Sequence, residues 1–132
     1  MNKEVSCGTI IIKDNKVLLI KSLKDEYGFP KGHMENEETE IETAIRETKE
    51  ETNINVKIIN NKRYVINYIV KNNVHKDVIY YLAKPIEPIN LIAQKEEIKE
   101  IKWVNIDDVI NMLPFENLKE MYIKVINDIR KV

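Results

Sequence analysis

The sequence of 132 residues lacks the features that would place it outside the ordinary globular class. It has one cysteine, Cys7, so no internal disulfide can form. It has no apolar run near the roughly 18 residues that a membrane-spanning helix needs, and no signal peptide with a basic start and small-residue cleavage site. It also has no internal repeat. We therefore expect a single domain, residues 1–132, in the cytoplasm and without membrane attachment.

An excess of charge of one sign is also lacking. The 21 Lys and Arg residues nearly balance the 22 Asp and Glu residues, which gives a formal net charge of −1. A general nucleic-acid-binding protein needs an excess of cations to contact phosphates, so the sequence argues against that class. A small phosphate-rich substrate is still compatible, because a bound metal ion would add positive charge that the residue count omits.

Carboxylates are concentrated in one segment of the chain. Glu47, Glu50 and Glu51 have the spacing i, i+3, i+4, which brings side chains together on one face of a helix. Carboxylates this close repel each other unless a cation lies among them. Hard oxygen ligands with no His or Cys nearby favour magnesium or manganese over zinc. The alternative interpretation is an acidic helix whose charges simply face solvent.

A loop containing proline and glycine precedes these carboxylates. Its sequence, Phe29-Pro30-Lys31-Gly32-His33, places a cation at the centre of a chain-breaking element. Gly32 permits either a positive φ angle or the close approach of its carbonyl group to a ligand. Together, the loop and the acidic helix predict a metal site.

The spacing of these residues resembles the signature of the Nudix hydrolases, which cleave nucleoside diphosphates linked to another group and use divalent metal ions. The matching positions are Gly32, Glu38, Arg46, Glu47, Glu50 and Glu51. Two positions depart from the family pattern, since Thr48 replaces an aliphatic residue and Asn53 replaces a glycine. Thr48 keeps a methyl group for packing, and asparagine suits the left-handed conformation of a helix C-cap.

The resemblance implies a role for each of these groups. Arg46 would not touch the metal but would hold the loop and helix in register through a bidentate pair with Glu38. A further acid, as ligand or general base, is expected at Glu97, with Glu96 or a solvated loop charge as the alternatives. The implied metal ligands are the carbonyl of Gly32 and the carboxylates of Glu47, Glu50, Glu51 and Glu97. The implied catalytic residues are Arg46, Glu47, Glu50, Glu51 and Glu97.

Segments on both sides of the acidic helix are similar to one subgroup of the family, the asymmetric diadenosine tetraphosphate hydrolases. These segments are Pro30–Glu35, Ile66–Tyr68 and Lys76–Ala83. Phosphate oxygens need cations or hydroxyl donors, and an adenine ring needs an aromatic platform. The candidate substrate-binding residues are Lys31, His33, Tyr68, Lys76, Tyr80 and Phe115. For Tyr68 and Tyr80, packing within a strand is the alternative.

Hydrophobic periodicity and turn signals divide the chain into elements. Strands are expected at 5–12, 17–20, 54–59, 63–70, 76–83 and 100–104, helices at 39–52, 107–113 and 115–129, and loops at 24–38 and 84–94. The first helix begins with a capping-box sequence, Thr39 to Glu42. This order predicts an α/β fold with a central mixed β-sheet between helices, which is the α/β/α sandwich that the Nudix resemblance also implies.

The resemblance implies a metal-dependent pyrophosphohydrolase that uses Mg²⁺ or Mn²⁺ and splits diadenosine tetraphosphate into ATP and AMP. One alternative is a broader nucleotide or RNA 5′-end pyrophosphohydrolase. Another is a Nudix module that senses a nucleotide without cleaving it, although such modules commonly lose the metal ligands. The expected partner is therefore a small nucleoside polyphosphate, and the protein is expected to be a monomer or a homodimer.

Overall fold

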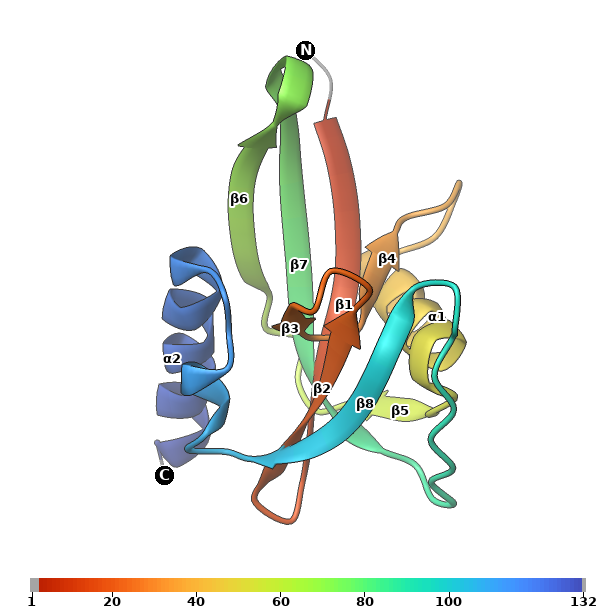
Figure 1. The fold of residues 1–132 in the computed structure, drawn as a ribbon, viewed down its shortest axis with the longest axis vertical. Helices are drawn as coiled ribbons and strands as arrows, with labels where there is room; N and C mark the ends of the chain where they lie inside the picture. The colour runs from red at the N-terminus through yellow and green to blue at the C-terminus, as the bar shows by residue number, and fades with distance from the viewer. Residues whose placement is uncertain (1–2, 132) are drawn as a thin grey trace.

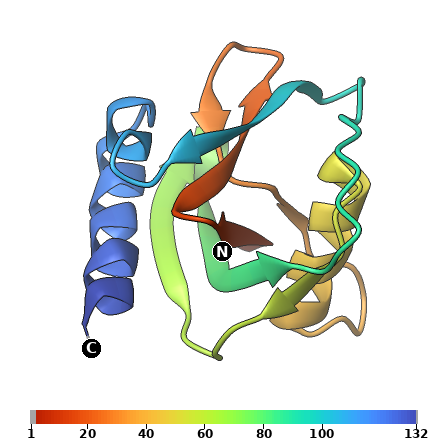
Figure 2. The same ribbon diagram turned by 90° about the horizontal axis from the view of Figure 1, so that it is seen from below.

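A mixed β-sheet with one helix against each face forms the architecture of this computed structural model, which describes residues 3–131 (Figures 1 and 2). The strands are β1 (Lys3–Lys13), β2 (Lys16–Ser22), β3 (Tyr27–Gly28), β4 (Lys31–His33), β5 (Val56–Ile58), β6 (Tyr64–Val70), β7 (Val74–Pro85) and β8 (Ile98–Asn105). The helices are α1 (Glu40–Thr52) and α2 (Glu116–Arg130), with short 3₁₀ turns η1 (Lys71–Asn73) and η2 (Val109–Asn111). No helix among the described residues is long and apolar enough to cross a membrane. The α/β/α sandwich predicted from the sequence is confirmed.

Strand β1 is the centre of the sheet because it pairs with three other strands. It runs parallel to β7 from the Lys3–His75 pair to the Ile11–Ala83 pair, and antiparallel to β2 and β4. The turn between β1 and β2 consists of Asp14 and Asn15, whose φ angles are 51° and 63°. Asp and Asn tolerate this left-handed conformation, which a tight two-residue hairpin turn requires.

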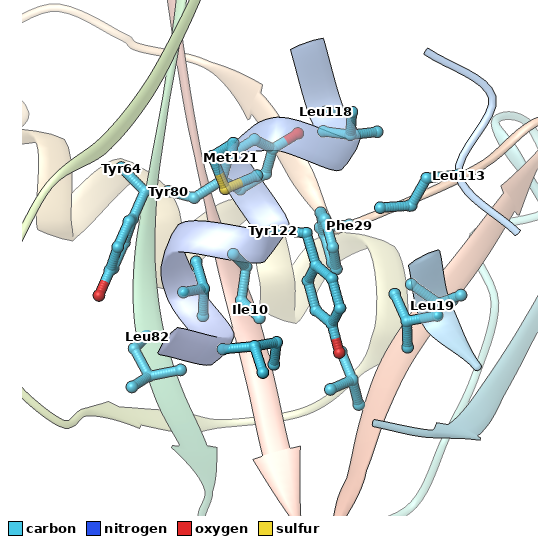
Figure 3. Close-up of a cluster of buried hydrophobic side chains, with 14 of the residues drawn as sticks. Ile10, Leu19, Phe29, Tyr64, Tyr80, Leu82, Leu113, Leu118, Met121 and Tyr122 are labelled. Atoms are coloured by element: carbon cyan, nitrogen blue, oxygen red, sulfur yellow. The ribbon is translucent and has the colours of Figure 1, made fainter. Parts of the chain in front are cut away.

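The alternation of side chains along β1 produces a core on each face of the sheet. Ile10 belongs to the larger core, which lies under α2 and includes Leu19 of β2 and Tyr122 of α2 (Figure 3). Phe29 lies at the centre of this cluster, stacked on Tyr122 at 5.9 Å between ring centroids. On the opposite face, Cys7 packs against α1 in a second cluster, and it is fully buried.

Helix α1 begins and ends as its sequence predicts. The Thr39 hydroxyl accepts a hydrogen bond from the Glu42 amide, and the Glu42 carboxylate accepts one from the Thr39 amide, which completes the capping box. Asn53 caps the other end in the left-handed conformation, with a φ angle of 67°. The acidic helix therefore has fixed ends on both sides of Glu47, Glu50 and Glu51.

Several sequence expectations are wrong in detail. The segment 24–38 is not a plain loop, because β3 and β4 form within it through backbone pairing to β2 and β1. The helix expected at 107–113 is only the single 3₁₀ turn η2. Its apolar residues Val109 and Leu113 are buried in the larger core, so tertiary packing stabilises an irregular segment there. Strand β8 begins at Ile98, two residues before the predicted start.

Candidate active site

Arg46 joins the loop to the acidic helix. Its guanidinium group donates to Glu38 from Nε at 2.6 Å and from Nη2 at 3.0 Å, which is the predicted bidentate pair. Nη2 also donates to the carbonyl oxygen of His33 at 3.0 Å. The hydrogen bonds from Arg46 hold the pKa of Glu38 down at about 2. Arg46 therefore fixes the end of β4 against α1.

The lack of a side chain at Gly32 allows the Glu47 side chain to lie against the loop. A Cβ atom on Gly32 would lie 1.9 Å from the Glu47 carboxyl carbon, so any larger residue here would displace the end of the Glu47 side chain. The alternative role for Gly32, a positive φ angle, is wrong, because no glycine in the described residues has one. The Glu47 carboxylate also accepts a 2.7 Å hydrogen bond from Arg46. Burial nevertheless raises the pKa of Glu47, with the neighbouring acids Glu50 and Glu97 adding to the effect.

Glu51 is the most buried acid of the site, with 5% of its surface exposed. Its carboxylate accepts a 3.1 Å hydrogen bond from the backbone amide of Lys31. Burial raises the pKa of Glu51 to about 8, and the charges of Glu47 and Glu97 act in the same direction. Because burial and neighbouring negative charges disfavour its ionised form, the Glu51 carboxylate should be strongly stabilised by a nearby cation.

Glu50, the third carboxylate of the predicted metal site, is half exposed, and its Oε1 accepts a 3.2 Å hydrogen bond from Arg46 Nη1. Arg46 thus donates to both Glu47 and Glu50, and no three acidic, His or Cys side chains within residues 3–131 form a ready-made metal cluster. The donor set nonetheless fits a hard divalent cation, since it consists of carboxylate oxygens with no sulfur or imidazole ligand. The buried Glu51 and the partly buried Glu47 also need positive charge to ionise together.

A cavity of about 630 Å³ opens beside the buried end of this helix. Glu51 and Glu97 both line it, whereas Glu96 does not. Glu97 comes from the segment before β8, so the fold brings a distant acid to the acidic helix. The predicted residues that line the cavity are Lys31, Glu51, Tyr68, Tyr80, Glu97 and Phe115. Arg46, Glu47 and Glu50 of α1 do not line the cavity.

The sheet register places the other predicted phosphate contacts on the face where the cavity opens. Lys76 of β7 is directly opposite Tyr68 of β6, and its ammonium nitrogen lies 6.0 Å from the Tyr68 ring centroid. Ser6 of β1 pairs with both His33 and Val78, so His33 shares the side of the sheet on which Val78 lines the cavity. His33 and Lys76 lie outside the cavity lining itself.

The two aromatic residues proposed for an adenine ring differ in exposure. Tyr80 is 2% exposed, and its ring packs edge-on against Phe29 at 5.5 Å. This packing makes Tyr80 a part of the cavity wall, in keeping with the strand-packing alternative. Phe115 is 52% exposed immediately before α2 and lines the cavity.

Sequence reasoning missed two parts of the site. A Cβ atom on Gly8 would lie 2.0 Å from the Pro30 carbonyl oxygen, so this glycine lets the loop lie against β1. Tyr27 lines the cavity, and the ammonium groups of Lys21 and Lys102 lie 5.2 and 4.9 Å from its ring centroid. These contacts become visible only in the folded structure. In the sequence Gly8 resembles an ordinary strand residue, and Lys102 is far from Tyr27 along the chain.

Comparisons with known proteins identify the family of this chain. The family model described as NUDIX domain matches residues 3–125. The asymmetrical bis(5′-nucleosyl)-tetraphosphatases of Rattus norvegicus and Mus musculus are 30% and 31% identical to this chain, and each match covers 86% of this chain and 87% of the relative. A C. elegans Ap4A hydrolase structure superposes with a TM-score of 0.85 at 26% identity, covering 98% of this chain and 99% of that one. The chain therefore belongs to the Nudix family of hydrolases.

Proposed function

We propose that this Nudix hydrolase cleaves diadenosine tetraphosphate, Ap4A, into ATP and AMP. The observation that carries the proposal is the cavity itself, which combines two carboxylates, Glu51 and Glu97, with the exposed ring of Phe115. A polyphosphate with a nucleoside at its end needs both features, a charged site for the phosphates and an apolar platform for the base. The named relatives, similar over most of both chains, support the same substrate.

Nudix hydrolases generally depend on divalent metal ions, and we propose Mg²⁺ or Mn²⁺ for this chain. The carboxylates of Glu47, Glu50 and Glu51, with the carbonyl group of Gly32, would hold the ion. When bound, such an ion neutralises phosphate oxygens and makes the attacked phosphorus more electrophilic. Glu47 and Glu50 would share their carboxylates between the ion and Arg46, and Arg46 would keep its bidentate pair with Glu38.

Glu97 is the proposed general base or additional ligand. It is exposed to solvent within the cavity, so it can contact a water molecule as well as the substrate. Glu51 is almost completely buried and has its carboxylate fixed by the Lys31 amide, which suits a ligand better than a proton-transfer group. The two acids thus have different environments and different proposed roles.

The substrate-binding groups surround this centre. Lys31, His33 and Lys76 supply positive charge or hydrogen-bond donors for the phosphates, and the Tyr68 hydroxyl supplies a further donor. Phe115 supplies the stacking surface, because its ring is free while the ring of Tyr80 is already packed against Phe29. Stacking of one base on one aromatic ring contributes on the order of 1–3 kcal/mol.

A substrate comparison tests the proposal. With magnesium present, we expect kcat/KM for Ap4A to exceed that for ATP by about tenfold or more, which is ~1.4 kcal/mol of transition-state discrimination. ATP and AMP should appear in equal amounts. Inositol polyphosphates and triphosphorylated RNA serve as competing substrates in the same assay. Formation of two ADP molecules, or better turnover of any competing substrate, would overturn the Ap4A assignment.

Phe115 provides an independent check on how the base is bound. Phe115→Ala should raise KM for Ap4A by about tenfold, since stacking is lost, while leaving turnover of inorganic tripolyphosphate unaffected. Ile123→Ala, which truncates an exposed apolar residue of α2 outside the cavity, is the matched control. Equal losses of kcat/KM for Ap4A and for tripolyphosphate would show that Phe115 stabilises the fold and does not bind the base.

A further inference from the structure

The segment between β7 and β8 carries Glu97 and is attached to the C-terminal end of α1. It runs alongside this helix in both views (Figures 1 and 2). The Ile92 amide donates to the Thr52 carbonyl at 3.0 Å, and the Gln94 amide donates to the Glu51 carbonyl at 3.2 Å. The last carbonyl groups of an α-helix have no partner within the helix, so here the neighbouring segment supplies one.

A short turn links this attachment to Glu97. The amide of Glu97 donates to the carbonyl of Gln94 at 3.0 Å, and the amide of Ile98 donates to the same carbonyl at 2.7 Å. Ile98 is the first residue of β8, so it is also fixed by the sheet. Glu97 is therefore placed between two anchors, the end of α1 and the start of β8.

Asn53 adds a side-chain contact to the first anchor. Its Nδ2 group donates a 2.9 Å hydrogen bond to the carbonyl of Asn90, 37 residues away in the sequence. Its backbone keeps the left-handed C-cap that ends α1, with a φ angle of 67° and its amide bonded to Lys49. A glycine at this position would adopt the same backbone conformation but could not make the bond to Asn90.

We propose that Asn53 is a positioning residue that holds the segment 90–97 and thereby places Glu97 at the cavity. The family usually has glycine at this position. In this chain, asparagine instead supplies a side-chain hydrogen bond that holds the segment carrying Glu97. The inference rests on the proposed role of Glu97, since Asn53 itself does not line the cavity. Asn53 acts through the geometry of the segment and not on the substrate.

The test compares Asn53→Gly with Glu97→Gln and with the double variant. Asn53→Gly preserves the C-cap and should lower kcat about fivefold, the scale of one net hydrogen bond, with KM little changed. Glu97→Gln should lower kcat by about 10². If Asn53 acts through Glu97, the double variant should be no slower than Glu97→Gln alone, because residues acting through one group are not additive.

Two further variants isolate the Asn53 donor. Asn53→Asp keeps the size and the tolerance for a left-handed backbone but loses the donor, so it should match the loss seen for Asn53→Gly. Asn72→Gly is the control, because Asn72 is also left-handed, with a φ angle of 64°, but lies at the tip of the β6–β7 hairpin. It should leave kcat unchanged, and wild-type kcat in Asn53→Asp would overturn the proposal.

A readout without metal or substrate separates positioning from general stability. In metal-free protein, Asn53→Gly should increase hydrogen exchange at the Ile92 and Gln94 amides by about fivefold, while exchange within β1 stays unchanged. If Glu97→Gln is fully active, the assigned role of Glu97 is wrong. If Glu97→Gln is impaired but the effect of Asn53→Gly is absent or simply additive, the role of Asn53 is wrong.

Discussion

The hydroxyl groups of Thr9 and Thr48 lie 2.6 Å apart in the buried interface between β1 and α1. Both residues are fully buried. Thr48 stands where the Nudix pattern has an aliphatic residue, and the sequence predicts that its methyl group is kept for packing. The structure shows instead that a polar residue in the helix is matched by a polar residue in the central strand. One hydroxyl donates to the other, so neither buried group lacks a partner and the departure from the family pattern is compensated within this chain.

This pairing predicts an asymmetric response to substitution. Thr48→Val should lower the free energy of unfolding by about 1–2 kcal/mol, because it leaves the buried Thr9 hydroxyl without a partner. Replacing both residues with valine should restore stability close to that of the wild type, since neither polar group then remains. Urea denaturation of the two single variants and the double variant measures this coupling. A double variant that loses the sum of the single effects would contradict the pairing.

Two glycines near the site should respond differently to alanine. A Cβ atom on Gly32 meets the end of the Glu47 side chain, which can swing aside. Gly32→Ala should therefore displace a metal ligand and lower activity by about 10² or more while changing stability little. A Cβ atom on Gly8 meets the backbone of Pro30 and Lys31, which cannot move independently. Gly8→Ala should lower both activity and the thermal midpoint, and equal stability of the two variants would contradict this distinction.

The fold was predictable where local signals and packing agree. The capping box at Thr39, the left-handed Asn53 and the apolar stripe of α2 all identify their elements from sequence alone. Segments held mainly by tertiary contacts were not predictable. Strands β3 and β4 have only two and three residues, too few for any periodic pattern, and exist because β2 and β1 supply hydrogen bonds. The single turn η2 gave a helical pattern because Val109 and Leu113 are core residues.

Only part of the candidate site follows from sequence spacing. The helix periodicity places Glu47, Glu50 and Glu51 on adjoining turns of α1, and the Nudix resemblance implies the pair between Arg46 and Glu38. Burial, however, cannot be read from spacing. Glu51 is nearly inaccessible and lines the cavity, whereas Glu50, one residue earlier, is half exposed and does not line it. The attachment of residues 90–97 to α1 depends on long-range hydrogen bonds and leaves no sequence pattern.

The raised pKa of Glu51 predicts how the metal-free protein responds to pH. Burial raises the pKa of Glu51 to about 8 in the folded state, well above the usual value of about 4.3 in an unfolded chain. The folded protein therefore binds this proton more tightly, so the free energy of unfolding should decrease as pH rises between these two values. In Glu51→Gln this contribution disappears, because the amide does not titrate.

Urea denaturation with EDTA between about pH 5 and pH 9 measures this effect. The Glu51→Gln variant should be more stable than the wild type at the alkaline end, and the difference should shrink toward the acidic end. Glu96→Gln is the control, since it removes an exposed acid from the neighbouring segment that does not line the cavity. A difference between wild type and Glu51→Gln that does not vary with pH would show that Glu51 is not the titrating group.

Binding of a divalent ion should stabilise the folded protein through the same carboxylates. Without metal, Glu50→Gln should leave stability nearly unchanged, because its pair with Arg46 is half exposed and such pairs contribute little. With Mg²⁺ or Mn²⁺ at 100 times its dissociation constant, the wild type should gain about 2.7 kcal/mol by linkage. Glu50→Gln and Glu51→Gln should gain much less stability and lose activity by orders of magnitude, whereas Glu96→Gln should behave as the wild type.

Thermal unfolding in EDTA and in metal, together with Ap4A turnover, provides the measurement. An acidic helix that merely faces solvent would give no metal-dependent shift in the wild type and full activity in both variants.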